Sequence, residues 1–195
     1  MQFPGVPDFI HQIPDGDTRE RSVCRDCGYV SYENPKVVVG SVVAHRDRVL
    51  LCRRAIEPRR GYWTLPAGYL EMGESIEEGA MREAFEEAEA QITLDGILAV
   101  YSISRIGQVQ VIFRARFADD AFPNFAAGPE SAEVSLFDWQ DIPWEQIAFP
   151  SVRWSLNAWR ANAHGALGAP VGNPAEDPRG SVRLPPEAAS QGSAL

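Results

Sequence analysis

The sequence predicts an α/β fold with a mixed β-sheet, because runs of β-branched and aliphatic residues alternate with two helical segments. Two of these runs, 35–44 and 48–54, are separated by the polar triplet His45-Arg46-Asp47, which indicates a pair of strands. Further strands are expected over 101–103, 109–117 and 134–139, and a last helix over 152–161. The first helix lies between the second and third of the predicted strands.

That first helix has a clear start signal. Ser75 is followed three residues later by Glu78, the spacing of a capping box, so the helix is expected to begin near Ile76. Helical periodicity then predicts a broad apolar stripe that packs on the sheet, formed by Ile76, Ala80, Met81, Ala84, Phe85 and Ala88. Another side of the helix carries Gly79, Glu83, Glu86 and Glu87.

The acidic side of the helix predicts a metal site. Glu83, Glu86 and Glu87 have an i, i+3, i+4 spacing that places them on one helix face. A solvated face is the simpler interpretation, but like charges at i, i+4 and anions near a helix C-terminus each cost a few tenths of a kcal/mol. A bound divalent cation removes this cost, and carboxylate oxygens are the ligands that Mg²⁺ or Mn²⁺ prefers.

The segment from Gly68 to Ala90 resembles the Nudix box, G-x5-E-x7-R-E-U-x-E-E-x-G-U, where U is a bulky aliphatic residue. The matching residues are Gly68, Glu74, Arg82, Glu83, Glu86 and Glu87. The chain departs from the pattern at Ala84, at Ala90, and at Glu89, where the pattern has glycine. Because glycine ends a helix in the left-handed conformation at little cost, Glu89 predicts a longer helix or a differently built cap.

The resemblance covers roughly residues 14–161. The segments ENPKVVVG, LLCRRAIEPRRGYWTLPAGYLEMGES and IPWEQIAFPSVRWSL are similar to the Nudix subgroup that carries a zinc ribbon before the catalytic domain. This resemblance implies an α/β/α sandwich over 35–164, preceded over 1–34 by a short zinc-ribbon-like segment. The remaining segment, 165–195, is rich in Gly, Pro, Ala and Ser and is expected to be a disordered tail.

Composition limits the class of protein. With 195 residues, 45% of them hydrophobic, the chain can build one packed domain. The sequence shows neither a membrane-spanning run nor a signal peptide, so we expect a cytoplasmic protein with no membrane partner. The net charge of −9 argues against nucleic acid as a partner, although a small phosphate ligand held through a metal remains compatible. A homodimer is left open.

Cysteine spacing indicates half of a zinc ribbon. Cys24 and Cys27 have the spacing of a zinc knuckle, but a closed tetrahedral site needs four ligands, and the earlier CxxC pair of related ribbons is missing. In the region where that pair is expected, the residues that can bind zinc are His11 and the weaker Asp8. Cys52 lies in an apolar strand and is expected to be a core residue. A ribbon held by packing without zinc is therefore favoured.

The Nudix resemblance implies the reaction and the roles of individual residues. The implied activity is hydrolysis of a nucleoside diphosphate linked to another group, with Mg²⁺ or Mn²⁺ as cofactor. Glu86 and Glu87 are the implied metal ligands, and Glu83 is a further ligand or orients them. The carbonyl of Ala67 matches a backbone ligand position, and Glu74 is expected to fix the loop by a salt bridge with Arg82.

Other site residues are expected outside the box. Glu133, before the strand 134–139, lies where some members place a general base or an additional metal ligand, although it is equally well explained as an exposed loop carboxylate. Arginines near the box are candidates to bind phosphates, namely Arg53, Arg54, Arg59 and Arg60. Tyr62, Trp63 and Tyr101 are candidates to stack on a flat ring, although an aromatic residue in a sheet is more often part of the core.

Substrate choice is not determined by these motifs. The SQPWPFPxS motif of NADH-type Nudix enzymes is absent, and so is the proline that follows the box in ADP-ribose-specific members. Similarity to the zinc-ribbon subgroup favours FAD or ADP-ribose, by analogy. The alternatives are a Nudix domain that senses a nucleotide without cleaving it, which the intact acidic set disfavours, and a zinc-ribbon nucleic-acid binder, which the charge and the missing cysteines disfavour.

Overall fold

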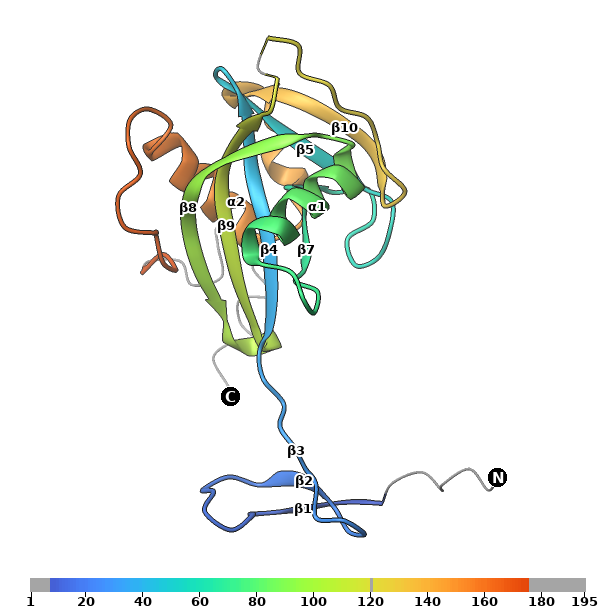
Figure 1. Ribbon diagram of the computed structural model, residues 1–195. Helices are drawn as coiled ribbons and strands as arrows, with labels where there is room; N and C mark the ends of the chain where they lie inside the picture. The colour runs from blue at the N-terminus through green and yellow to red at the C-terminus, as the bar shows by residue number, and fades with distance from the viewer. Residues whose placement is uncertain (1–7, 120, 176–195) are drawn as a thin grey trace. The chain divides into compact units, whose positions relative to one another are not determined.

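The computed structural model describes residues 8–119 and 121–175, shown in Figure 1. The chain divides into two compact units, Met1–Pro35 and Lys36–Leu195. Within the described residues, no helix is both long and apolar enough to cross a membrane.

The first unit is a small antiparallel sheet. Its strands are β1 (Phe9–Gln12), β2 (Arg21–Cys24) and β3 (Val30–Ser31), paired in that order. The Asp17 carboxylate accepts a hydrogen bond from Arg21 (2.8 Å), and the Arg21 guanidinium lies over the ring of Tyr32 (5.2 Å). Polar contacts and one aromatic ring therefore help to hold this sheet.

The second unit contains the mixed sheet that the sequence predicts. The order of its main strands is β10 (Ser131–Asp138), β5 (Arg48–Arg54), β4 (Lys36–His45), β9 (Gln108–Phe117) and β8 (Ile92–Ile103). The β4 and β9 strands are parallel, and the other pairs are antiparallel. Two short strands join it, β6 (Trp63–Thr64) beside β5 and β7 (Ala67–Tyr69) beside β4.

Two helices cover the two faces of this sheet (Figure 1). They are α1 (Ile76–Ala88) and α2 (Pro150–Ala161). Neighbouring residues of β4 point to opposite sides: Val42 belongs to the core cluster that includes α2, and Val43 to the cluster that includes α1. Short 3₁₀ turns complete the unit at η1 (Ser104–Ile106), η2 (Trp139–Asp141) and η3 (Trp144–Gln146). The result is the expected α/β/α sandwich.

Two segments differ from the sequence-based expectations. The β8 strand begins at Ile92 rather than at residue 101, because its first half contains Gly96 (φ 142°) and two register shifts, which interrupt the alternating pattern of a regular strand. Part of the segment predicted as a tail pairs with β8: the Val171 N–H donates to the Leu98 carbonyl, and the Val100 N–H donates to the Val171 carbonyl (both 2.9 Å). Residues 176–195 of that segment lie outside the described residues.

Candidate active site

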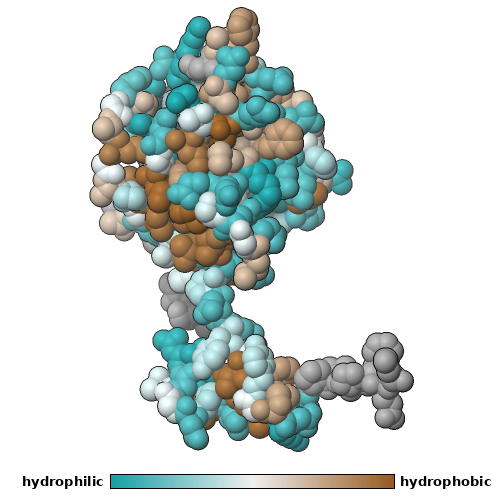
Figure 2. All heavy atoms as spheres, viewed as in Figure 1, coloured by the Kyte–Doolittle hydropathy of each residue, from teal (hydrophilic) through white to brown (hydrophobic). Residues whose placement is uncertain are grey.

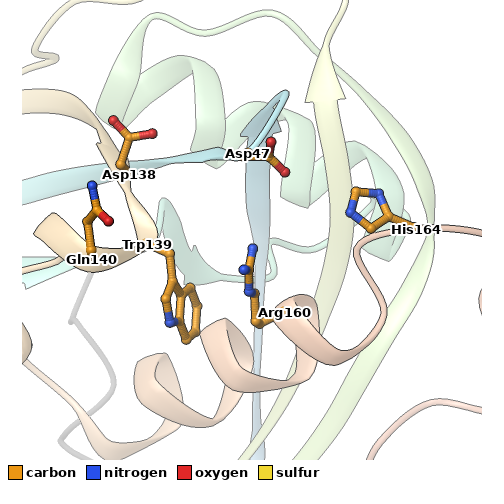
Figure 3. Close-up of a pocket in the computed structure, with 6 residues that line it drawn as sticks. All are labelled: Asp47, Asp138, Trp139, Gln140, Arg160 and His164. Atoms are coloured by element: carbon orange, nitrogen blue, oxygen red, sulfur yellow. The ribbon is translucent and has the colours of Figure 1, made fainter.

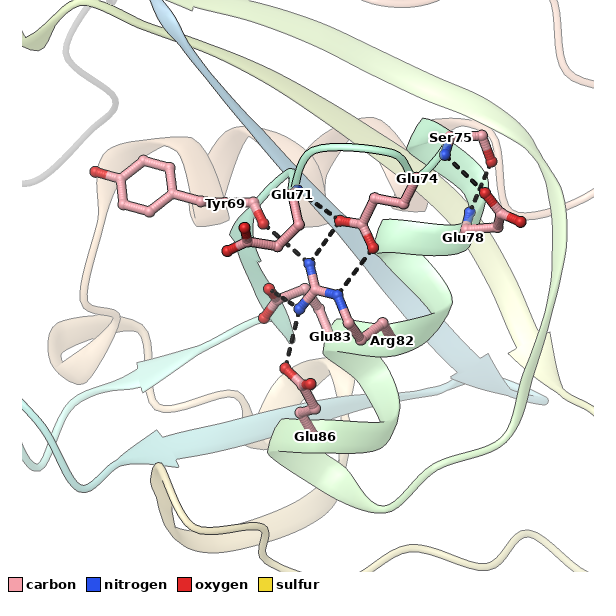
Figure 4. A network of polar contacts seen from close by, with 8 residues as sticks. All are labelled: Tyr69, Glu71, Glu74, Ser75, Glu78, Arg82, Glu83 and Glu86. Atoms are coloured by element: carbon pink, nitrogen blue, oxygen red, sulfur yellow. Dashed lines mark hydrogen bonds and ion pairs between the residues drawn. The ribbon is translucent and has the colours of Figure 1, made fainter.

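The helix α1 begins where the sequence predicts, with Ser75 as its N-cap residue. The Glu78 N–H donates to the Ser75 hydroxyl (3.2 Å), and the Ser75 N–H donates to the Glu78 carboxylate (2.7 Å), as Figure 4 shows. The predicted capping box is confirmed. Two backbone N–H groups of the first turn are thereby satisfied, and the start of the helix is fixed.

The buried face of α1 matches the prediction only in part: Ala80, Ala84 and Ala88 are buried as expected, but two large residues of the predicted stripe are not. Glu83 and Glu87 are buried, with 8% and 7% of their surface exposed, whereas Met81 and Phe85 are exposed. Small residues make up the rest of the buried face: Gly79, Ala80, Ala84 and Ala88. The prediction that Met81 and Phe85 pack on the sheet was therefore wrong. Figure 2 shows hydrophobic side chains at the surface on the side of this unit that carries α1.

Close packing of α1 on the sheet explains this choice of residues. A Cβ atom at Gly79 would lie 2.9 Å from a methyl group of Val39 on β4. At Gly68, in β7, an added Cβ would collide with the carboxylate of Glu83. The helix therefore presents glycine and alanine where it lies close to the strands. The Gly68 position of the box leaves room for the Glu83 carboxylate.

Arg82 is the centre of a network of polar contacts (Figure 4). Its guanidinium donates to Glu74 at 2.8 and 3.0 Å, to Glu83 at 2.7 Å, to Glu86 at 2.9 Å, and to the carbonyl of Tyr69 at 3.0 Å. The expected salt bridge between Glu74 and Arg82 is thus present, and Arg82 also holds the two acidic residues on its own helix. The hydrogen bonds from Arg82 lower the pKa of Glu74 to about 2.

Glu87 is buried, and few polar groups offset the cost of burying its carboxylate. Its Oε2 atom accepts a hydrogen bond from the Ala67 N–H at 3.4 Å, near the upper limit for such a contact. Burial, and then the charge of Glu83, raise the pKa of Glu87 to about 8. Burial also raises the pKa of Glu83, although Arg82 opposes that shift. A buried carboxylate without a full set of partners is costly, and such residues occur often at functional sites.

The acidic residues of α1 carry the carboxylate oxygens that a hard divalent cation prefers. Mg²⁺ usually takes one or two carboxylates and completes its octahedron with waters and substrate phosphates. Glu86 is exposed and Glu87 faces inward beside the Ala67 backbone, so the two carboxylates belong to different surroundings. In the described residues, His, Cys, Asp and Glu side chains do not form a preassembled group of three ligands. The Arg82 guanidinium contacts an oxygen of both Glu83 and Glu86.

The loop before β10 and the start of that strand carry two further glutamates, Glu130 and Glu133. Glu133 lies on β10 opposite Arg53, with which it forms an exposed ion pair at 3.5 Å. Glu130, three residues earlier, has a charge that raises the pKa of both Glu83 and Glu87. Sequence reasoning did not consider Glu130, although the same loop motif, Gly-Pro-Glu-Ser-Ala-Glu, contains it. A register shift between Ser131 and Glu133 interrupts the pairing of β10 with β5 at this point, and the sequence does not reveal it.

The predicted phosphate-binding arginines have different surroundings. Arg54 donates to the Pro58 carbonyl (2.8 Å), and its charge lowers the pKa of Glu87, so it lies on the side of the acidic residues. Arg53 donates to the Gly61 carbonyl (3.0 Å) and forms the ion pair described above. Both hydrogen bonds fold the loop 55–62 back onto the end of β5.

The other two arginines lie in that loop. Arg59 places its guanidinium over the ring of Tyr62 (5.4 Å), and Arg60 is exposed. Of the three aromatic candidates, Tyr62 is partly accessible, but Trp63 and Tyr101 are buried in the core. Trp63 and Tyr101 thus take the core positions that are more usual for aromatic residues in a sheet, where strands place alternate side chains in the core.

The half zinc ribbon keeps its local geometry. Cys24 is buried and Cys27 is exposed. Hydrogen bonds from the backbone of Cys27 and Asp26 lower the pKa of the Cys24 thiol. His11 pairs with Ser22 in the ladder between β1 and β2, and no metal cluster occurs among the residues that the structure describes. Two thiols do not close a tetrahedral zinc site, so the described ligands do not fit zinc.

Figure 3 shows a further cavity of about 570 Å³. It is lined by Asp47, Asp138, Trp139, Gln140, Arg160 and His164. Asp47 directly precedes β5, whereas Arg54, beside the acidic residues, is the last residue of that strand. A strand of this length separates the two places by roughly 20 Å. The cavity is therefore not part of the predicted site.

Comparison with known proteins identifies the family. Residues 34–155 match the NUDIX domain family, and residues 7–33 match the Nudix N-terminal family. The first match covers more than half of the chain and includes α1 and its acidic residues. The chain belongs to the Nudix family and is a Nudix hydrolase, so the resemblance found in the sequence is confirmed.

Similar proteins are known by sequence and by structure. An ADP-ribose pyrophosphatase of Methanocaldococcus jannaschii is 30% identical over 132 residues, which cover 65% of this chain and 78% of that protein. A MutT-like protein of Streptomyces ambofaciens is 33% identical over 102 residues, or 52% of this chain and 60% of that protein. The crystal structure of a NUDIX hydrolase from Nitrosomonas europaea has a TM-score of 0.79 at 42% identity, covering 88% of this chain and 98% of that chain.

Proposed function

We propose that this Nudix hydrolase cleaves the diphosphate of ADP-ribose to give AMP and ribose 5-phosphate, with FAD as the second candidate substrate. The observation that carries the proposal is the acidic set of α1, with Glu87 buried, in a chain similar to an ADP-ribose pyrophosphatase along most of that protein's length. A water oxygen bonds to one phosphorus, and the bridging oxygen leaves with the other phosphate.

Divalent metal dependence is part of this proposal. Nudix hydrolases use ions such as Mg²⁺ or Mn²⁺, and we assign Glu86 and Glu87 as ligands, with Glu83 as a third ligand or as the residue that orients them. The carbonyl of Ala67 is the proposed backbone ligand. A bound ion would neutralise phosphate charge and lower the pKa of an attacking water. Support comes from the raised pKa values of Glu83 and Glu87, since a nearby cation offsets the cost of burying both charges.

Substrate contacts are proposed for side chains around the end of β5. Arg54 is the first choice to bind a phosphate, because it lies on the side of Glu87. Arg53, Arg59 and Arg60 are further candidates, and Tyr62 is the proposed platform for a flat ring. Arg59 lies over Tyr62, so ring binding requires it to move. With Trp63 and Tyr101 in the core, few aromatic platforms remain, which favours ADP-ribose over FAD.

The loop carboxylate that assists proton transfer is assigned to Glu130, with Glu133 as the alternative. Glu130 is supported by the electrostatic effect of its charge on Glu83 and Glu87. We expect Glu130→Gln to lower kcat by at least about 100-fold, the usual contribution of general acid–base catalysis. Glu133→Gln is the matched comparison, and a larger loss in that variant would return the role to Glu133.

The substrate assignment is tested by steady-state kinetics at equal Mg²⁺ with ADP-ribose, FAD, NADH, a diadenosine polyphosphate, ATP and dGTP. A pocket that binds both halves of a dinucleotide loses kcat as well as apparent affinity when one half is removed. We therefore expect the highest kcat/KM for ADP-ribose or FAD. A higher value for ATP or dGTP refutes this substrate class, and binding of ADP-ribose without any turnover supports a nucleotide sensor instead.

The proposed partner is a small nucleotide. The net charge of −9 favours a small nucleotide over a nucleic acid, and a cytoplasmic location and a homodimer stay predictions. A zinc-ribbon nucleic-acid binder is disfavoured by the two-thiol site as well as by charge.

We further propose that the first unit holds no zinc, although Cys24 and Cys27 keep a knuckle-like turn. Metal analysis of the purified protein should then find well under one zinc per chain, and Cys24→Ser should change the thermal midpoint little. One tightly held zinc per chain would contradict this proposal and point to His11 or to a partner chain for the missing ligands.

A further inference from the structure

The loop before β10 runs along the C-terminal end of α1. The Gly128 N–H donates to the Glu87 carbonyl (3.1 Å), and the Ala126 N–H donates to the Ala88 carbonyl (2.9 Å). The last four carbonyls of a helix have no partners inside it, and they carry the negative end of the helix dipole. The last turn of α1 contains no basic residue. Two N–H groups of the loop therefore bond to carbonyls at this end of the helix and offset part of its negative dipole, close to the residues proposed to bind the metal.

Gly128 allows this approach because it lacks a side chain. A Cβ atom at this position would overlap the Glu86 carbonyl oxygen and would lie 2.8 Å from its carbonyl carbon and 3.2 Å from that of Glu87. These are backbone atoms of a helix, which do not move aside as a flexible side chain does. Gly128 is buried, and its φ angle is not in the left-handed region, so the requirement is for space.

The same loop carries Glu130, and its far end is also fixed. The Ser131 N–H donates to the Gly128 carbonyl (3.0 Å), and the Ala55 N–H donates to the Glu130 carbonyl (2.8 Å). The backbone between Gly128 and Ser131 is thus held by the end of α1 on one side and by the residue after β5 on the other. The Glu130 side chain starts from this fixed segment, two residues after the glycine whose N–H bonds to the end of α1.

We propose that Gly128 is a positioning residue, which sets the distance between the Glu130 loop and the end of α1 that carries Glu86 and Glu87. The proposal rests on the proposed function, because the roles of Glu86, Glu87 and Glu130 come from it. A larger residue at position 128 displaces the loop from the helix. It thereby separates Glu130 from the metal ligands and removes two hydrogen bonds from the last turn of α1.

The test compares Gly128→Ala with Gly168→Ala. Gly168 has an ordinary φ angle and open space around its Cβ position, so it is a matched control for the added methyl group. With ADP-ribose, we expect Gly128→Ala to lower kcat at least tenfold, to leave KM within about threefold, and to raise the Mg²⁺ concentration needed for half-maximal rate. Gly168→Ala should match the wild type. Unchanged kcat and Mg²⁺ dependence in folded Gly128→Ala would overturn the proposal.

A double-variant cycle separates positioning of Glu130 from a general loss of packing. If Gly128 acts on kcat through Glu130, Gly128→Ala should lower kcat much less in a Glu130→Gln background than in the wild type. The same tenfold loss in both backgrounds would contradict this route.

Hydrogen exchange of the wild type keeps the proposal testable even if Gly128→Ala does not fold. Addition of Mg²⁺ should slow exchange of the Gly128 and Ala126 amides and leave the Val171 amide unchanged, because Val171 is bonded to β8 and not to α1. If exchange of the Gly128 and Ala126 amides does not change, the proposed link between this loop and the metal ligands is overturned. If the wild type cleaves none of the diphosphates, the proposed function is refuted. If the wild type cleaves ADP-ribose and Gly128→Ala does so equally well, only the role of Gly128 is refuted.

Discussion

The two helices on either side of the sheet are built in opposite ways. The helix α2 buries large apolar side chains, including Trp154, Leu156 and Trp159, and ends with a basic residue, Arg160, in its last turn. The helix α1 buries small residues together with two glutamates, exposes a methionine and a phenylalanine, and has no basic residue in its last turn. One helix thus follows the usual rules of stability, and the other departs from them where the proposed chemistry takes place.

The difference shows how a helix with buried glutamates is held on the sheet. Burial of aromatic rings stabilises α2 directly: the Trp159 ring lies 6.4 Å from that of Trp139, and the Trp154 ring lies 5.2 Å from that of Tyr101. The helix α1 instead depends on polar partners from outside it, namely Glu74, the Tyr69 carbonyl and the N–H groups of the loop 126–128. Its stability is therefore more sensitive to charge, pH and bound metal.

Removal of a proposed metal ligand should have the largest effect. Glu86→Gln and Glu87→Gln keep the shape of the side chain but remove its charge, so we expect kcat/KM to fall by about 1,000-fold or more, equivalent to about 4 kcal/mol of transition-state stabilisation. The fold should remain intact by circular dichroism. Glu77→Gln, on an exposed position of the same helix, is the control, and undiminished turnover in either folded ligand variant would refute the assignment.

A change in α2 should give the opposite result. Trp159→Ala removes a buried ring and leaves a cavity, so the free energy of unfolding should fall by about 3–5 kcal/mol. Because α2 lies on the other face of the sheet, kcat at a temperature where the variant is folded should change little. Denaturant unfolding and kinetics measure both quantities, with exposed Asn157→Ala as the control. A loss of kcat with unchanged stability would contradict the division of roles between the two helices.

The stability of the metal-free protein should depend on the ionisation of Glu87. Its pKa rises from 4.5 to about 8 in the folded protein, mainly because of burial. The folded state therefore keeps a proton that the unfolded chain releases, so stability falls as the pH increases through this interval. Thermal midpoints in EDTA should drop more steeply from pH 5 to pH 8 for the wild type than for Glu87→Gln. Parallel curves would show that Glu87 does not ionise in this range.

The smallest effect is expected at the end of α1. Glu89 has φ 48° and ψ 22°, a left-handed conformation that costs a residue with a side chain about 1 kcal/mol. Glu89→Gly should therefore raise the free energy of unfolding by up to about 1 kcal/mol. Glu77→Gly, inside the same helix, should lower it by a similar amount, and a loss of stability in Glu89→Gly would show that its side chain makes a compensating contact.

Local signals predicted much of the fold. The capping box placed the start of α1 correctly, and the β-branched runs located β4, β5 and β9 to within a residue or two. The start of β8 was missed because Gly96 and two register shifts disturb its pattern. At Glu89 the sequence predicted a longer helix or a different cap; the helix in fact ends there, and Glu89 itself takes the left-handed conformation that glycine usually provides.

The sequence by itself determined the chemistry of the site: carboxylates at helical spacing, Arg82 and Glu74 at the distances of the Nudix box, and a cysteine pair too small to close a zinc site. Those properties depend on residue type and on short spacings, which the chain fixes locally. Only the tertiary structure decided that Glu83 and Glu87 face inward while Met81 and Phe85 face outward, and that the loop with Glu130 bonds to the end of α1. Burial depends on the surfaces that distant segments present, here β4, β7 and the loop that contains Gly128.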